Sequence, residues 1–247
     1  MQVADDLTVT TFDNRWSAGE AHYLYHEIFT HDDYLGGLPP LRPGSVVVDA
    51  GANIGLFALR VARACPGVRL IALEPAPDTC ALLRHNLAEA GLTGVEVKQV
   101  ALGAQPGWSR LTVFRHLPAN STTRPDQKPA QWTASMRSLE PEQADAMLET
   151  EVVEVEVVRL SDVLPADVTA VDLLKIDVEG AELDVLRGIA DDDWPSIAHV
   201  VVEVHDVEGR LGAVVDLLAA RGFACDVRVP AMMASDLDHH IVTARRA

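Results

Sequence analysis

Cysteines and long apolar segments are scarce in this sequence. The three cysteines show no metal-binding spacing, and an odd number is typical of reduced thiols in a cytosolic protein. No apolar run reaches the length of about 18 residues that a membrane span requires. The segment Met1–Asp6 lacks the basic and apolar stretches of a secretory signal. We therefore expect a cytoplasmic protein that does not enter a membrane.

Positive charge is scarce as well. The chain has 37 acidic and 20 basic residues, which gives a formal net charge of −17. Such a chain repels phosphate backbones unless it carries a local basic patch, and no such patch is visible. Pairs such as Arg245 and Arg246 are ordinary solvated positions. We expect a small-molecule substrate rather than nucleic acid.

The size of the chain predicts one main domain. With 247 residues, of which 48% are hydrophobic, it can bury one sizeable core. Residues 1–40 are predicted to form a helical lead-in, whose helix at about 18–30 either caps the site or forms a homodimer interface. Residues 41–247 are predicted to form an α/β domain with an insertion at about 104–160. Long irregular insertions are usually binding loops or disordered, and both interpretations stay open.

The most informative segment is the glycine-containing loop that follows Val46–Val48. These three residues show no polar alternation, which is typical of a parallel strand buried on both faces. The run continues through Asp49 into a turn with glycine at 51 and 55. Gly51 and Gly55 permit positive φ and close approach of a ligand, and Asn53 is well tolerated in left-handed conformations. The segment predicts a loop that binds a nucleoside cofactor, although a plain strand-to-helix turn has the same pattern.

A second apolar run, Leu70–Leu73, ends in an acidic residue. In a βαβ unit Glu74 lies at the tip of the neighbouring strand and faces the first loop, where a carboxylate accepts hydrogen bonds from ribose hydroxyls. Pro75 ends the strand because it cannot donate to the ladder. Together with the glycine loop, Glu74 predicts an adenosine-containing cofactor.

A third apolar run, Leu173–Ile176, ends in a cluster of acids. Asp177 closes the strand and is therefore expected to point into the ligand crevice. Glu179 and Glu182 lie near the start of the next helix, where its dipole also favours acids, and Gly188 is expected just past the end of that helix.

The strand at 199–204 is predicted to carry Glu203, His205 and Asp206 to the same crevice. Because imidazole is neutral and basic near pH 7, His205 is the candidate general base. Asp206 or Glu179 is the candidate for orienting its ring. A loop histidine without a catalytic role is the alternative.

Other strands are expected from the sequence pattern. A third strand of the sheet is predicted near 95–100, with Val100–Gly103 at its end, and a short strand at 111–114. The run 151–158 alternates with period two, which predicts a half-exposed strand outside the parallel set. Residues 223–229 and 241–244 are predicted to form the last two strands.

Five segments in this order resemble FkbM-type methyltransferases, which are class I enzymes that use S-adenosylmethionine. The resemblance runs from about residue 20 to the C-terminus, and its most specific segment is Lys175–Glu182. The matching segments are Asp49–Gly55, Leu73–Pro75, Asn86, Lys175–Glu182 and Val202–Asp206. The family implies a Rossmann-like, mostly parallel seven-stranded sheet with an antiparallel last strand and helices on both faces.

The resemblance also implies roles for individual residues. Ala101 is expected near the adenine, and the Asn120-Ser121 pair near the active site. Asp49 and Asp177 are expected to face the positively charged methionine end of the cofactor. Segments 25–29 and 33–35 are similar to the lead-in of members attached to polyketide or peptide assembly lines.

We therefore expect an S-adenosylmethionine-dependent O-methyltransferase. Its acceptor is expected to be a hydroxyl of a polyketide, peptide or sugar, either free or tethered to a carrier protein. A metal is not required, but Asp177, Glu179 and Glu203 are the oxygen ligands that a magnesium ion would use. An NAD-linked oxidoreductase and a non-catalytic cofactor-binding scaffold are the alternatives, because a glycine loop with a ribose acid serves several cofactors.

Overall fold

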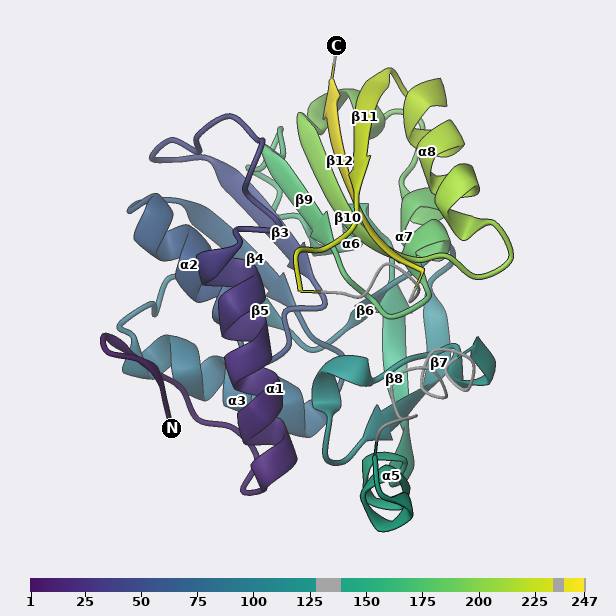
Figure 1. Cartoon of the computed structure of the whole chain (residues 1–247). Coiled ribbons are helices and arrows are strands. Elements are labelled where there is room, and N and C mark those ends of the chain that lie inside the picture. Colours follow the sequence, from purple (N-terminus) through teal and green to yellow (C-terminus); the bar gives the residue numbers. More distant parts are fainter. Residues whose placement is uncertain (128–138, 233–237, 247) are drawn as a thin grey trace.

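A mixed seven-stranded sheet forms the centre of the computed structural model, which describes residues 1–127, 139–232 and 238–246 (Figure 1). Five neighbouring strands, from β10 to β5, run parallel, and β12 runs antiparallel to both of its neighbours. In spatial order the strands are β11 (Phe223–Arg228), β12 (His239–Arg246), β10 (His199–His205), β9 (Leu173–Ile176), β3 (Val46–Ala50), β4 (Arg69–Leu73) and β5 (Glu96–Lys98). This order confirms the predicted sheet, including its antiparallel last strand.

The central strands are buried on both faces, as their apolar runs predicted. Successive residues of a strand point to opposite faces, so Val47 packs into one apolar cluster and Val48 into the other. Helices cover both faces (Figure 1). One face carries α1 (Arg15–Tyr25), the π-helical turn η1 (His26–Thr30), α2 (Leu56–Ala64) and α3 (Pro77–Glu89), and the other carries α6 (Leu160–Val163), α7 (Glu182–Gly188) and α8 (Arg210–Ala220).

The segment after β5 builds a separate three-stranded sheet, which lies below the main sheet in Figure 1. Its strands are β6 (Ala101–Leu102), β8 (Thr150–Val158) and β7 (Gly107–Phe114). The prediction that residues 151–158 lie outside the parallel set is confirmed. The remaining elements here are η2 (Pro118–Asn120), η3 (Pro125–Gln127) and α5 (Pro141–Met147). The part of the predicted insertion at 128–138 lies outside the described residues.

Two details of the predicted elements were wrong. Val100–Gly103 does not end the third strand: β5 stops at Lys98, because its partner β4 ends before Pro75, and Ala101 pairs instead with β8. Gly188 does not follow α7 but is its last residue. An added Cβ there would lie 2.1 Å from the carbonyl oxygen of Gly103, so this glycine serves close packing rather than helix termination.

The N-terminal residues contain a short hairpin that the sequence did not predict, formed by β1 (Gln2–Ala4) and β2 (Leu7–Thr8). The predicted lead-in helix begins earlier than expected, at Arg15, because the Asn14 side chain accepts hydrogen bonds from the amides of Trp16 and Ser17. A short 3₁₀ turn, η5 (Trp194–Ser196), precedes β10. No helix in the described ranges has the length and apolarity to cross a membrane.

Candidate active site

A cavity of about 870 Å³ lies at the carboxyl ends of the central strands. In open α/β sheets this is where ligands bind. Its floor comes from the residues that follow β3, β4 and β9 and from the end of β10. Helix α1 with η1, and the insertion around η2, supply the remaining walls. The cavity therefore joins the glycine loop after β3 to Asp177 and His205, which the sequence predicted to lie in one crevice.

The loop after β3 has the backbone shape that its sequence predicted. Gly51 has φ +81°, and an added Cβ would lie 1.8 Å from the carbonyl oxygen of Asp177. Asn53 has φ +48°, as expected for the left-handed region, and Gly55 has φ +98° at the start of α2. Asn86, on α3, donates to the carbonyl of Ile54 at 2.9 Å and so holds this loop from behind.

Glu74 is held in place by backbone amides beside this loop. Its carboxylate accepts hydrogen bonds from the amide of Asn53 at 3.0 Å and from that of Ala76 at 2.9 Å. Burial raises the pKa of Glu74 to about 7, although these two amides act in the opposite direction. Glu74, Pro75 and Ala101 all line the cavity.

A buried ammonium ties the first loop to β9. Lys175 Nζ lies 3.1 Å from Asp49 Oδ1 and 3.3 Å from Asp177 Oδ2, and it donates to the carbonyl of Gly51 at 2.8 Å. Asp49 is fully buried and is absent from the lining of the cavity, whereas Asp177 and Lys175 belong to it. The expectation that Asp49 faces the cofactor was wrong: as part of β3 its side chain turns to Lys175 beneath the cavity floor. The role of Lys175 was not predicted from the sequence.

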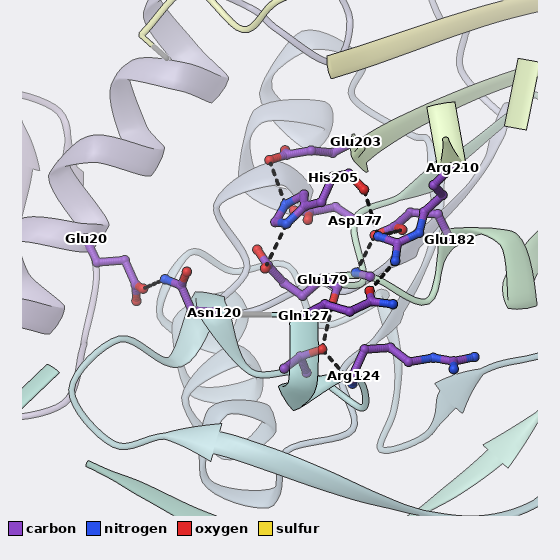
Figure 2. A network of polar contacts seen from close by, with 12 residues as sticks. Glu20, Asn120, Arg124, Gln127, Asp177, Glu179, Glu182, Glu203, His205 and Arg210 are labelled. Carbon is purple, nitrogen blue, oxygen red and sulfur yellow. Dashed lines mark hydrogen bonds and ion pairs between the residues drawn. The ribbon is translucent and has the colours of Figure 1, made fainter. Parts of the chain in front are cut away.

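At the far end of the cavity, His205 lies between two carboxylates (Figure 2). Its Nδ1 is 3.6 Å from Glu179 Oε2, and its Nε2 is 3.8 Å from Glu203 Oε1. Although burial raises the pKa of Glu203, contacts with His205 and a hydrogen bond from Tyr34 lower it to about 2. The His205 ring also contacts that of His239, with 4.0 Å between ring centroids. The structure thus brings together the predicted His205, Glu179 and Glu203.

Two acids from the same motifs lie elsewhere. The Asp206 carboxylate accepts a hydrogen bond from the amide of Leu211 at 3.0 Å, in the first turn of α8, and Asp206 is absent from the cavity lining. The prediction that Asp206 orients His205 was therefore wrong, because its side chain caps a helix. Glu182 is fully buried. Its carboxylate accepts a hydrogen bond from the amide of Gly180 at 2.6 Å and lies 3.3 Å from the Arg210 guanidinium, so Glu182 has a structural role.

The N-terminal segment adds polar groups to the site that were not predicted from the sequence. Tyr34 is buried and donates to Glu203. Glu27, from the π-helical turn, lines the cavity at 2% exposure, and burial, together with Glu203 and Asp177, raises its pKa well above the usual range. Glu20 accepts hydrogen bonds from the Asn120 side chain at 3.4 Å and from the Ala119 amide at 3.2 Å (Figure 2). The Asn120-Ser121 pair therefore lines the cavity, where the resemblance had placed it.

The strand order and the cavity at the carboxyl edge define a class I methyltransferase fold. Among solved structures the chain resembles a methyltransferase FkbM from Methylobacillus flagellatus KT, with a TM-score of 0.57 and 15% identity; the match covers 92% of this chain and 51% of that one, about half its length. It also resembles the fibrillarin pre-rRNA processing protein of Methanococcus jannaschii, with a TM-score of 0.52, 13% identity and coverage of 100% and 84%. At these identities the likeness concerns the fold alone.

Sequence comparison places the chain more closely. Residues 49–225 match the model of the methyltransferase FkbM domain. The chain is 41% identical over 241 residues to the 31-O-demethyl-FK506 methyltransferase FkbM of Streptomyces tacrolimicus, covering 94% of this chain and 92% of that protein. It is 37% identical over 250 residues to Methyltransferase 1 of Beauveria bassiana, with coverage of 100% and 97%. The chain belongs to the FkbM methyltransferase family.

Proposed function

We propose that this protein is an S-adenosylmethionine-dependent O-methyltransferase that acts on a hydroxyl group of a natural-product intermediate. The observation that carries the proposal is the sequence of groups along the carboxyl edge of the sheet. Glu74 follows β4, Gly51 follows β3, Asp177 follows β9, and His205 ends β10. Because these strands are neighbours, the four groups form a continuous row from a ribose-type acid to a base.

The residues at one end of this row fit the cofactor. Glu74 presents a carboxylate for the ribose hydroxyls, and Gly51 lets the backbone approach the ligand without a Cβ. Asp177 lies where the positively charged methionine end would be. Burial raises the pKa of Asp177 to about 7, despite Lys175, and a bound cation would favour its ionised form. When bound, the cofactor supplies a methyl group on a positively charged sulfur.

The other end of the row fits the acceptor. A hydroxyl acceptor must lose its proton, which requires a base within hydrogen-bond reach. His205 lines the cavity, and Glu179 lies 3.6 Å from its Nδ1 and orients the ring, which leaves Nε2 as the proton acceptor. Glu20, on α1, and Asn120, on η2, meet beside this end and close the wall around the acceptor. Enclosure and positioning supply much of the rate acceleration of methyl transfer.

Oxygen as the acceptor atom is supported by the name of a relative. The Streptomyces tacrolimicus protein, at 41% identity, is a methyltransferase of 31-O-demethyl-FK506. By analogy we propose an acceptor of the polyketide, peptide or sugar class, either free or tethered to a carrier protein. Family membership disfavours the NAD-linked oxidoreductase and the non-catalytic scaffold that the sequence left open.

Calorimetric binding of S-adenosylmethionine and S-adenosylhomocysteine tests the proposal. We expect micromolar affinity, weakened at least tenfold by Glu74→Ala, or about 1.4 kcal/mol. Asp78→Ala removes an exposed acid of α3 that does not line the cavity, and it should leave the affinity unchanged. Absence of binding to folded wild-type protein would overturn the proposal. Binding would justify a screen of hydroxylated acceptors with and without EDTA.

A further inference from the structure

Three side chains at the far end of the cavity have the composition of a transition-metal site. Glu203 and His205 lie on β10, two residues apart and so on one face of the strand, and His239 is the register partner of His205 on β12. One ligand atom from each of the three residues lies within 4.8 Å of the other two. Glu203 and His205 are buried and His239 is half-buried, and all three line the cavity.

The three groups lie close enough together to share one ion. His205 Nε2 and Glu203 Oε1 are 3.8 Å apart, a loose ion pair that an ion between them would tighten. Two ligands that each lie about 2.1 Å from a tetrahedral ion are about 3.4 Å apart. Separations of up to 4.8 Å in the group therefore have to shorten by up to about 1.4 Å when an ion binds, through rotation of the side chains.

The outer partners of these groups match those of metal ligands. A metal-bound histidine usually directs its second ring nitrogen at a carboxylate or carbonyl, which fixes the ring. Glu179 Oε2 lies 3.6 Å from Nδ1 of His205, on the side of the ring away from Glu203 (Figure 2). Tyr34 donates to Oε2 of Glu203 and leaves Oε1 directed at His205. His205 and Glu203 are thus each oriented by a second residue, Glu179 and Tyr34 respectively.

We propose that Glu203, His205 and His239 bind a divalent transition-metal ion. Two imidazoles and one carboxylate favour ions of the manganese-to-zinc series over Mg²⁺, which prefers oxygen ligands. The surrounding charge also favours a cation, because the Glu179 carboxylate lines the same cavity, whereas Lys175 is already paired with Asp49 and Asp177. The set differs from the oxygen-only set of Asp177, Glu179 and Glu203 that the sequence suggested for magnesium.

The role of the ion rests on the proposed function, because the site lies at the end of the cavity assigned to the acceptor hydroxyl. An ion with three protein ligands keeps open positions, through which it can bind and polarise that oxygen. In this state His205 is a ligand; the ion would lower the pKa of the bound hydroxyl, and its proton would pass to Glu179, a carboxylate that lines the same cavity. Binding of the ion itself can be measured without any acceptor.

Cobalt titration of metal-free protein tests the site. Protein treated with EDTA and then dialysed is titrated with Co²⁺ by calorimetry, while visible absorption reports coordination. We expect one Co²⁺ per chain, and affinity at least tenfold weaker in His239→Ala and in Glu203→Gln. The matched control is His240→Ala, which removes the next histidine of β12, on the opposite face and outside the cavity lining. It should retain the affinity of the wild type.

Several results would overturn the inference. One is the absence of Co²⁺ and Zn²⁺ binding to folded wild-type protein. Another is an equal loss of Co²⁺ affinity in His239→Ala and His240→Ala, and a third is binding of Mg²⁺ as tight as that of Co²⁺. Thermal melts of each variant separate loss of the site from loss of the fold. S-adenosylhomocysteine binding, measured with EDTA on the same samples, distinguishes the two proposals: if the nucleoside binds but no metal does, only the metal site fails. If the metal binds but the nucleoside does not, the methyltransferase proposal fails instead.

Discussion

The two ends of the cavity are built by different means. At the cofactor end, the loop after β3 and Glu74 are positioned by backbone geometry: positive φ angles at Gly51 and Gly55, and two amide hydrogen bonds to Glu74. At the opposite end, where we propose that methyl transfer occurs and which we call the transfer end, Glu203 and His205 from β10 meet side chains from three other segments of the chain. Those side chains are Tyr34, Glu179 and His239.

This difference determines how each end responds to change. A binding loop built from backbone groups has little room for an added atom, but it tolerates exchange of side chains that point away from the ligand. A cluster of buried charges depends on each partner, because removing one leaves the others uncompensated. We therefore expect changes at the cofactor end to affect folding and cofactor affinity together, and changes at the transfer end to affect turnover.

The largest effect is expected for Gly51→Ala. The new Cβ would lie 1.8 Å from the Asp177 carbonyl oxygen, at a φ of +81°, so the loop and β9 must separate. Urea denaturation should show a loss of more than about 4 kcal/mol in unfolding free energy, and S-adenosylhomocysteine binding should disappear. Gly37→Ala is the control, because Gly37 has φ +90° but nothing within 4 Å of an added Cβ. It should cost only about 1 kcal/mol. Equal losses in the two variants would show that close packing at Gly51 is unimportant.

The next effect is expected for His205→Ala. With an acceptor identified by the screen, kcat should fall by about 10²-fold or more, because either a base or a metal ligand is lost. S-adenosylhomocysteine affinity should change less than about threefold, or about 0.65 kcal/mol, since the nucleoside binds at the other end of the row. Steady-state kinetics combined with calorimetry checks this split. A parallel loss of cofactor affinity would contradict the division between the two ends.

The same division explains what the sequence could predict. Gly51, Asn53 and Glu74 act through local geometry, and strand-end motifs indicate local geometry directly. Tyr34 escaped prediction because its partner, Glu203, is 169 residues away in the chain and no pattern connects them. His239 begins the last strand, and only the pairing of β12 with β10, which no sequence pattern indicates, places it beside His205.

Errors in the prediction followed from side-chain direction. Asp49 and Asp177 both occur at strand ends, but Asp49 still belongs to β3 and turns to Lys175, whereas Asp177 follows β9 and reaches the cavity. Asp206 lies one residue past His205, and its carboxylate caps α8. The motif therefore predicted which acids gather at this edge, but not which of them face the ligand.

A smaller effect is expected from pH at the cofactor end. The pKa of Glu74 is raised to about 7 from 4.5. Between these two pH values the carboxyl group is protonated in the free folded protein but ionised in the unfolded chain. Its contribution to stability is complete below pH 4.5 and is lost as pH rises through about 7. Ribose hydroxyls favour the ionised carboxylate, so S-adenosylhomocysteine affinity should increase from pH 6 to pH 8 by up to about tenfold. Calorimetry across this range should show a weaker increase in Glu74→Gln, and an unchanged slope would contradict the role of Glu74.

The smallest effect is expected for Asn53→Gly. Asn53 has φ +48°, which glycine adopts without strain. The hydrogen bond from the backbone amide of residue 53 to Glu74 is retained in the variant. Unfolding free energy and S-adenosylhomocysteine affinity should each change by less than about 1 kcal/mol. Thermal melts and calorimetry check this expectation. A large loss of affinity would mean that the Asn53 side chain itself contacts the ligand, and the cofactor end would then depend on side chains as well.

The place of β12 has a consequence for synthesis of the chain. Strand β12 inserts between β10 and β11, although residues 239–246 are made after both of them. Until these residues leave the ribosome, β10 presents an open edge of Val200, Val201 and Val202, of the kind that invites mispairing. His239 begins the same strand, so the transfer end is also completed last. The seven-stranded sheet is therefore completed only after β12 has been made, and until then β10 offers an unpaired edge.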